Sequence, residues 1–297
     1  MGECMRLSST LGPAHRLTRC LMTHETHLSV LGRHPPEVTM LYDRPMNSGS
    51  GITIDGLSFA YGASSALMDV SFSVERGCFT GLLGPNGAGK STLLSLLTGL
   101  LAMQLGEAYI DDINIRVQPR HALARLGIVF QSQALDLDLT VAQNMAYAAA
   151  LRGYWGGNAR RRIDEKLELM GIAHRGREKT RKLNGGHRRR LEIARALVHQ
   201  PTVLILDEPT VGLDIPSRSQ LVEHVHQLAT SENLTVLWAT HLVDEIRKSD
   251  NLVVLHRGQL RAAGPVAQIL AQHGGDSVPV LFERLTSADE ASKDADA

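Results

Sequence analysis

One glycine-rich segment constrains this chain more than any other part of its 297 residues. It follows the pattern G-x-x-x-x-G-K-[ST], in which glycines let backbone N–H groups surround phosphate oxygens without steric conflict. The segment consists of Gly84, Pro85, Asn86, Gly87, Ala88, Gly89, Lys90, Ser91 and Thr92. We expect it to bind a nucleoside triphosphate, with Lys90 on the β- and γ-phosphates and Ser91 as a ligand of Mg²⁺.

The flanking residues place this loop between a strand and a helix. Residues 78–83 are mostly apolar and fit a short buried strand. The loop is followed by an apolar helix face built from Leu93, Leu96, Leu97 and Leu100. The partial positive charge of a helix N-terminus favours phosphate. A strand, a glycine loop and a helix in this order distinguish a phosphate site from an ordinary glycine-rich turn.

Charge and cysteine content exclude several classes of protein. Lys plus Arg and Asp plus Glu both number 31, so no nucleic-acid partner is expected. The three cysteines form no C-x-x-C pair, which argues against a disulfide framework or a zinc site. The sequence has neither an apolar run of about 18 residues nor a signal-peptide pattern. We expect a cytoplasmic protein that reaches a membrane only through other chains.

Composition divides the chain into three regions. Residues 1–49 are rich in His, Arg, Ser and Pro, and we predict a disordered N-terminal extension or an artefact of the chosen start codon. The histidines in it lack the spacing of metal ligands. Residues 50–275 are expected to form one nucleotide-binding domain with a helical insert at about 132–187. Residues 276–297 are expected to be a short C-terminal tail.

The expected strands indicate an α/β fold. Residues 52–59 and 66–74 carry strand signals typical of antiparallel pairing. Residues 202–206 and 234–240 are continuous apolar runs, as in a parallel sheet covered on both faces. The other predicted elements are a helical stretch over 139–171, a helix through Ile246, a hairpin over 252–260 and a short helix over 266–272. The fold class is a P-loop NTPase core with a parallel sheet, an antiparallel β subdomain and an inserted α-helical subdomain.

Polar side chains follow the predicted buried strands where each strand ends. They are Gln131, Asp207, Glu208 and His241. The C-terminal edge of an open α/β sheet is where ligands bind, and the glycine loop lies on the same edge. We expect Asp207 to hold Mg²⁺ and Glu208 to orient and deprotonate water. Gln131 is expected to bind Mg²⁺ and the attacking water, and His241 the γ-phosphate. A strand-end cap or an ion pair is the alternative for the two carboxylates.

Tyr61 lies in a predicted turn upstream of the glycine loop. An exposed aromatic ring offers a face on which a purine can stack, whereas the same ring can equally pack in the core.

Taken in order, these motifs resemble those of the ATP-binding cassette (ABC) ATPases over residues 52–265. Further matches are the Leu183-Asn184-Gly185-Gly186-His187 signature segment and the Val211-Gly212-Leu213-Asp214 loop. The resemblance implies that two cassettes, a homodimer, enclose ATP head to tail. Asn184, Gly185, Gly186 and His187 of one chain would then face the γ-phosphate held by the other. It also implies that Tyr61 stacks on adenine.

The signature segment departs from the family pattern L-S-G-G-Q at two positions. Asn184 keeps a donor for phosphate, and His187 keeps one ring donor and one acceptor. We therefore expect hydrolysis to persist. A His187 protonated near pH 6.5 would place a positive charge beside phosphate.

Residues 131–141 and 280–286 resemble the drug- and polysaccharide-exporter branch of this family. The variant signature also resembles, more weakly, cassettes of quinoprotein alcohol-dehydrogenase systems. These likenesses imply an ATPase subunit on the inner face of the cell membrane, where it powers export by a separate integral membrane permease. The alternatives are a soluble cassette ATPase acting in DNA repair or translation, and a regulatory cassette that does not hydrolyse ATP.

Overall fold

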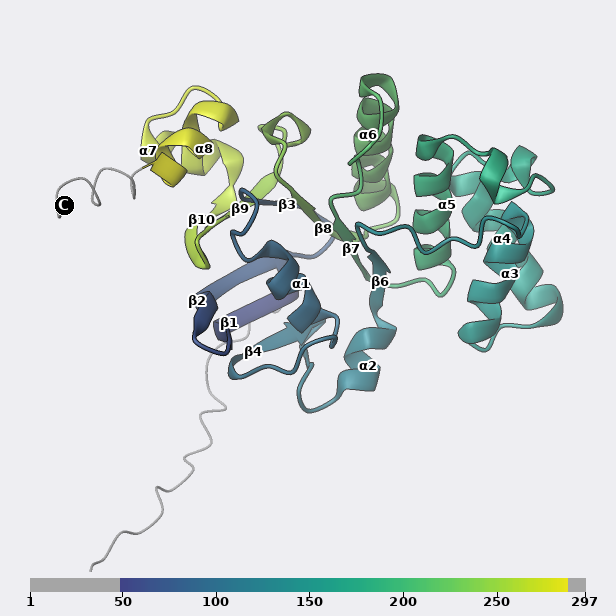
Figure 1. Cartoon of the computed structure of the whole chain (residues 1–297), viewed down its shortest axis with the longest axis horizontal. Helices are drawn as coiled ribbons and strands as arrows, with labels where there is room; N and C mark the ends of the chain where they lie inside the picture. The colour runs from purple at the N-terminus through teal and green to yellow at the C-terminus, as the bar shows by residue number, and fades with distance from the viewer. Residues whose placement is uncertain (1–48, 288–297) are drawn as a thin grey trace, which may run out of the picture. The chain divides into compact units, whose positions relative to one another are not determined.

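The computed structural model describes residues 49–287 and contains two sheets, as predicted (Figure 1). The larger sheet has the strand order β10-β9-β3-β8-β7-β6. In chain order its strands are β3 (Phe79–Leu83), β6 (Leu126–Val129), β7 (Val203–Asp207), β8 (Thr235–Thr240), β9 (Asn251–His256) and β10 (Gln259–Pro265). All neighbouring strands pair in parallel except β10, which returns antiparallel to β9.

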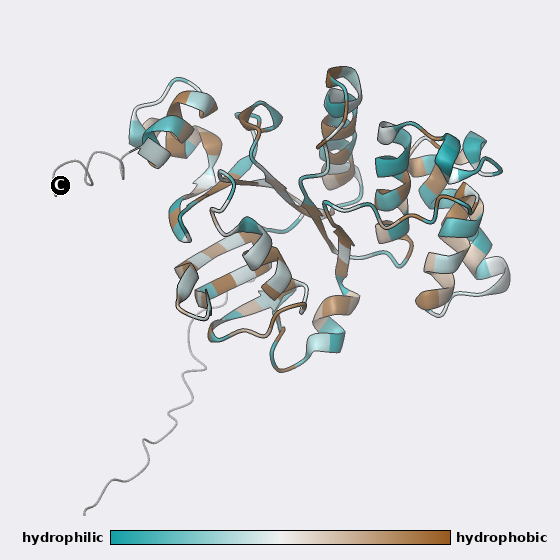
Figure 2. Ribbon diagram, in the orientation of Figure 1, coloured by the Kyte–Doolittle hydropathy of each residue, from teal (hydrophilic) through white to brown (hydrophobic). Residues whose placement is uncertain are grey.

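The centre of this sheet is apolar because helices and the second sheet cover it. Every residue of β3, β7 and β8 is buried, and Trp238 of β8 has no exposed surface. These central strands are largely brown in Figure 2, the colour of hydrophobic residues. Continuous apolar runs therefore predicted the parallel sheet correctly, since neither face of its central strands meets water.

The smaller sheet is antiparallel and has the order β2-β1-β4-β5. Its strands are β1 (Ser50–Tyr61), β2 (Ser64–Glu75), β4 (Leu105–Ile110) and β5 (Ile113–Asn114). Val70, Phe72 and Val74 of β2 are buried while the residues between them are exposed. This alternation places one face of the sheet on the core and leaves the other in water.

The helices fall into groups along the large sheet. The helix α1 (Lys90–Leu97) follows β3, and α2 (Pro119–Ala124) precedes β6. The helices α3 (Val141–Leu151), α4 (Gly156–Leu169) and α5 (Gly185–Leu197) pack together beyond β6, where Figure 1 shows them side by side. The remaining helices are α6 (Ile215–Ser231), α7 (Val266–His273) and α8 (Val278–Ser287).

Local capping fixes where the inserted helices begin. Thr140 and Gln143 form a capping box at the start of α3, in which the side chain of each residue bonds the backbone N–H of the other. Asn184 caps α5, its Oδ1 accepting from the N–H of His187 at 2.8 Å. A helical insert is thus present between β6 and β7, as predicted, and α5 begins at the expected glycines.

Two local expectations are wrong. Leu100 does not extend the apolar face of α1, because the helix ends at Leu97 and Leu100 is 65% exposed. The predicted helix through Ile246 is a single 3₁₀ turn, Val243–Glu245. The side chain of Glu245 turns inward there to hydrogen-bond Thr210 and Trp238, and the chain then reaches β9 within a few residues.

The tail region beyond residue 275 contains the helix α8, which packs on α7 and β9 through buried Val278 and Leu281. Residues 288–297 and 1–48, including the predicted N-terminal extension and its histidines, lie outside the described residues.

Truncation of Leu93 tests the packing of α1. Leu93 has no exposed surface and belongs to the same buried cluster as Leu82 and Leu237. We expect Leu93→Ala to lower the free energy of unfolding by about 2–5 kcal/mol, because it leaves a cavity in the core. Leu100→Ala should change it by less than about 0.5 kcal/mol. Urea denaturation of the full chain measures both, and equal effects would contradict the observed end of α1.

Candidate functional site

The main chain of β8 brings the predicted site residues together. Just past β3, the N–H of Gly84 donates to the carbonyl of Thr240 at 3.3 Å. Just past β7, the N–H of Glu208 donates to the carbonyl of Ala239 at 2.9 Å. His241 follows β8 directly. The glycine loop, Glu208 and His241 therefore meet at the C-terminal edge of the sheet, as the sequence predicts.

A cavity of about 320 Å³ opens between these groups. It is lined by Ala66, residues 85–92, Gln131, Glu208, Val211 and His241. Among the predicted catalytic residues, Gln131, Glu208 and His241 all border the cavity. The space is large enough for the phosphate portion of a nucleotide. Its wall contains a positively charged side chain, Lys90, and a negatively charged one, Glu208.

Glycine is required at both ends of the loop. A Cβ on Gly84 would lie 2.5 Å from the carbonyl oxygen of Leu255, and one on Gly89 would lie 2.7 Å from that of Ala66. Gly89 also has a φ of 105°, a conformation that other residues rarely adopt. The helix α1 starts directly after Gly89, and Lys90, Ser91 and Thr92 of its first turn line the cavity.

Lys90 is buried, and its charge is already shared among several oxygens. Its Nζ donates to the carbonyl of Gly84 at 2.6 Å and to that of Pro85 at 3.3 Å. It also lies 3.4 Å from Glu208 Oε1, and both side chains are less than a tenth exposed. A buried ammonium of this kind is stable only with such partners. A phosphate group in the cavity could replace the carboxylate among them.

Glu208 is held between Lys90 and His241. His241 Nδ1 lies 2.7 Å from Glu208 Oε2, so the ring donates its N–H to the carboxylate. Glu208 has a φ of 47°, a left-handed conformation that is uncommon for a side chain of this size. Backbone strain of this type occurs most often at functional sites.

Asp207 lies behind Glu208 and does not border the cavity. It is 9% exposed, and its Oδ1 has no hydrogen-bond partner among residues 49–287. Burial raises the pKa of this carboxyl, and the neighbouring charge of Glu208 raises it further. Lys90 and Arg189 oppose this shift. An orphaned buried carboxylate oxygen beside a phosphate loop fits a place that a divalent cation completes.

The signature residues are placed elsewhere. Asn184, Gly185, Gly186 and His187 form the N-terminal end of α5, and none of them borders the cavity. Within one chain the structure therefore separates two groups of predicted nucleotide-binding residues. The arrangement leaves the signature end of α5 free to face a site that another chain carries.

His187 is not poised to gain a proton near pH 6.5. Burial lowers its pKa, and the charges of Arg175, Arg190 and His174 lower it further. Its Nδ1 lies 2.5 Å from Asn184 Oδ1 and 3.2 Å from an Arg175 guanidinium nitrogen. The positive charge expected from His187 is thus supplied beside it by Arg175, which no sequence motif identified.

Tyr61 ends β1 and is 54% exposed. Its ring meets Phe59 edge to face, with centroids 4.9 Å apart, and it does not line the cavity. The role of Tyr61 in stacking on adenine stays a prediction.

Sequence reasoning missed a buried carboxylate beneath the site. Glu245 is 2% exposed and accepts a hydrogen bond from Trp238 Nε1 at 2.9 Å and another from the Thr210 hydroxyl. Thr210 follows Glu208 closely in sequence, and Trp238 precedes His241 on β8. The segment after β7 and strand β8, which His241 follows, are therefore both hydrogen-bonded to one side chain. No local sequence signal distinguishes Glu245 from its exposed neighbour Asp244.

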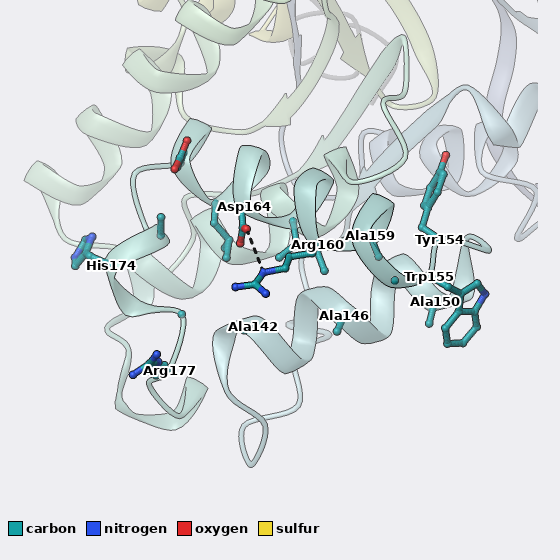
Figure 3. Close-up of a pocket in the computed structure, with 16 residues that line it drawn as sticks. Ala142, Ala146, Ala150, Tyr154, Trp155, Ala159, Arg160, Asp164, His174 and Arg177 are labelled. Atoms are coloured by element: carbon teal, nitrogen blue, oxygen red, sulfur yellow. Dashed lines mark ion pairs between the residues drawn. The ribbon is translucent and has the colours of Figure 1, made fainter.

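A larger hollow of about 770 Å³ lies in the helical insert, away from this chemistry (Figure 3). Alanines of α3 and α4 form its floor, and Trp155 stands at one end. The ion pair of Arg160 with Asp164, 3.9 Å long, lies along it. The hollow contains no residue of the glycine loop. Residues 49–287 include no helix with the length and apolar character needed to span a membrane.

Comparisons with known proteins agree on one family. The model of the family described as "ABC transporter" matches residues 67–211. The linearmycin resistance ATP-binding protein LnrL of Bacillus subtilis is 35% identical over 225 residues, covering 75% of this chain and 72% of its own. The Nod factor export ATP-binding protein I of Ralstonia nicotianae is 36% identical, with 82% and 77% covered. A sulfate/thiosulfate import ATP-binding protein of Synechococcus elongatus is also 36% identical, with 76% and 65% covered.

Solved structures share the fold. The structure of cbiO1 from Clostridium perfringens, part of the ABC transporter complex cbiONQ, has a TM-score of 0.69 and 30% identity, covering 75% of this chain and 92% of its own. A dimeric ATP-binding cassette in a post-hydrolysis state, bound to ADP and phosphate, has a TM-score of 0.64 and 26% identity, with 72% and 98% covered.

Replacing Asp207 tests whether its burial costs stability. An acid whose pKa is raised by folding contributes stability below its unfolded-state pKa and loses it as the pH rises through the folded value. At pH 7.5 without metal, Asp207→Asn should therefore raise the thermal midpoint of the full chain by a few degrees. Addition of Mg²⁺ with ATP should stabilise the wild type more than the variant.

Asp276 is exposed, so Asp276→Asn serves as the control. Its thermal midpoints, measured without metal and with Mg²⁺ and ATP, should equal those of the wild type. A lower midpoint for Asp207→Asn would mean that the carboxylate is satisfied in the folded chain.

Proposed function

Because this chain belongs to the ABC transporter family and is an ATP-binding subunit, we propose that it hydrolyses ATP between two copies of itself and thereby drives export through a separate membrane permease. The observation that carries the proposal is the cavity at which the glycine loop, Gln131, Glu208 and His241 converge.

The residues around the cavity have different roles toward the triphosphate. Backbone N–H groups of the loop bind the phosphates, and Lys90 exchanges its contact with Glu208 for one with the β- and γ-phosphates. This exchange releases Glu208 Oε1 to accept a proton from the attacking water. The Nδ1–H of His241 keeps Oε2 in place. For the other ring nitrogen, Nε2, to donate a hydrogen bond to the γ-phosphate, the imidazole has to carry a second proton.

The donor set fits Mg²⁺. The Ser91 hydroxyl, the Gln131 side chain and the unpaired Oδ1 of Asp207 are oxygen ligands of the type that this ion prefers. When bound, Mg²⁺ neutralises negative charge that develops on the phosphate oxygens. Asp207 would then gain the partner that its buried oxygen lacks.

A second copy of the chain completes the site. The signature end of α5 carries donors for phosphate but lies away from the cavity of its own chain. Val211, on the segment after β7, and Ile215, the first residue of α6, are 44% and 74% exposed. Exposed apolar side chains next to an incomplete ligand site favour a chain–chain contact. The similar dimeric cassette bound to ADP and phosphate supports a homodimer.

We infer that the permease docks beside Gln131. A groove of about 210 Å³ runs between α3, α5 and the loop after β6, and its lining includes Phe130, Leu151 and His199. Phe130 and Leu151 are 37% and 68% exposed. A membrane partner seated there would hold the chain on the cytoplasmic face. The relatives named for Nod factor export and linearmycin resistance support export, although an import protein has similar identity.

Glu208→Gln tests the proposed chemistry. The amide keeps the shape of the side chain but cannot take a proton from water, so phosphate release should fall by about 10²–10⁴-fold. ATP binding should persist, and the variant should elute as a dimer in ATP and Mg²⁺. Exposed Glu168→Gln is the control. Unchanged turnover in Glu208→Gln would refute the assignment.

Leu151→Asp tests the proposed permease contact. A negative charge in place of this exposed leucine should abolish co-purification of the tagged full chain with an integral membrane protein from detergent-solubilised membranes, while ATP binding is retained. Val117→Asp changes a side chain that is 65% exposed elsewhere on the surface and should co-purify normally. Retention of the permease by Leu151→Asp would exclude this groove.

A further inference from the structure

The loop that carries Gln131 is held in place by a helix rather than by its own contacts. We call residues 130–134 the Gln131 loop. One guanidinium nitrogen of Arg189, on α5, donates to the carbonyl of Phe130 at 2.9 Å, and the other donates to the carbonyl of Gln131 at 3.3 Å. Arg189 is 3% exposed. The buried side chain of Arg189 thus holds the main chain at Gln131 through two hydrogen bonds.

Glu192, one turn further along α5, holds the other end of the loop. Its Oε1 accepts from the N–H of Ala134 at 3.0 Å, and its Oε2 accepts from Arg189 at 2.8 Å. Glu192 is 6% exposed. Arg195 adds a hydrogen bond of 2.6 Å to the Ala134 carbonyl. We call Arg189, Glu192 and Arg195 the α5 clamp.

A buried ion pair of this kind is a poor means of stabilising a fold. Removing two charges from water is costly, and a buried pair often does no better than apolar residues of similar size. The same pair specifies one geometry, because its hydrogen bonds to the loop require fixed positions for the carbonyls and the N–H. The clamp therefore fixes where the Gln131 loop lies more than it stabilises the domain.

The position of the clamp connects three surfaces. The Gln131 side chain borders the ATP cavity. Glu192 and Arg195 line the groove beside Phe130 and Leu151. The helix that bears the clamp starts at the signature glycines. A displacement of α5, from either the partner cassette or the groove, must therefore move the main chain of Gln131.

We propose that Arg189 and Glu192 are positioning residues that place Gln131 for Mg²⁺ binding and link the movement of α5 to that ligand. The proposal rests on the proposed function, in which Gln131 contacts the metal. Neither side chain touches the cavity. Loss of either one leaves a buried charge and loop main-chain groups unpaired, so the Gln131 side chain would leave its metal-binding position.

The test measures Mg²⁺ affinity in single and double variants. A fluorescent ATP analogue is bound to the full chain, and the Mg²⁺ concentration that gives half of the Mg²⁺-dependent signal is determined. Arg189→Gln and Glu192→Gln should each raise this concentration by about 10-fold, as expected for residues that orient a metal ligand. Binding of the analogue without Mg²⁺ should be unchanged. In a Gln131→Ala background the same two substitutions should have almost no further effect.

Arg190→Gln is the matched control, because Arg190 lies on the same helix but bonds Gln220 instead of the loop. Arg189→Lys provides a second variant that keeps the charge while losing the planar fork, and it should shift the Mg²⁺ midpoint in the same direction by a smaller factor.

Two results would overturn the proposal. A full 10-fold shift in the Gln131→Ala background would mean that Arg189 acts without Gln131, for example through its charge near Asp207. Unchanged Mg²⁺ affinity in folded Arg189→Gln and Glu192→Gln would mean that the α5 clamp does not position Gln131 for Mg²⁺ and is only a structural contact. Failure of the wild-type chain to bind the ATP analogue would instead refute the proposed function.

Discussion

The pairing of β8 with both β3 and β7 is the constraint on which the site depends. Leu83 lies opposite Thr240, and Asp207 lies opposite Ala239, so three strands end at the same level. The hydrogen bonds from Gly84 and Glu208 to the last carbonyls of β8 then extend this register beyond the strands. A shift of one residue in either pair would separate Lys90 from Glu208. Catalytic geometry here follows directly from parallel sheet register.

The sequence predicts the sheet and the chemistry of its edge because both are local patterns. Apolar runs mark the buried strands, and the glycine loop and the polar residues after β6, β7 and β8 are contiguous motifs. The end of α1 and the turn at Val243–Glu245 were missed, since tertiary contacts outweigh helical periodicity in such short segments. Glu245, Arg189 and Glu192 escaped notice for another reason. Each of them bonds at least one group that lies more than 30 residues away in sequence, and no local pattern shows which acid or arginine is buried.

The site concentrates several buried charges in one small region. Lys90, Asp207, Glu208, Arg189 and Glu192 are each less than a tenth exposed. Most are satisfied by fixed partners, whereas one oxygen of Asp207 is not. Proteins commonly accept reduced stability where a ligand will later complete a polar group. Burial and neighbouring positive charges lower the pKa of His187 at the signature end of α5. The positive charge there comes from Arg175, which stays ionised at any physiological pH.

The distribution of tryptophan has a practical consequence. The sequence contains two tryptophans. Trp155 is 71% exposed in the helical insert, whereas Trp238 is completely buried and bonded to Glu245 below the catalytic edge. A water-soluble quencher will reach the first indole and not the second. Intrinsic fluorescence can therefore follow the insert and the catalytic core separately in one unlabelled sample, so that the order of their movements during a turnover becomes measurable.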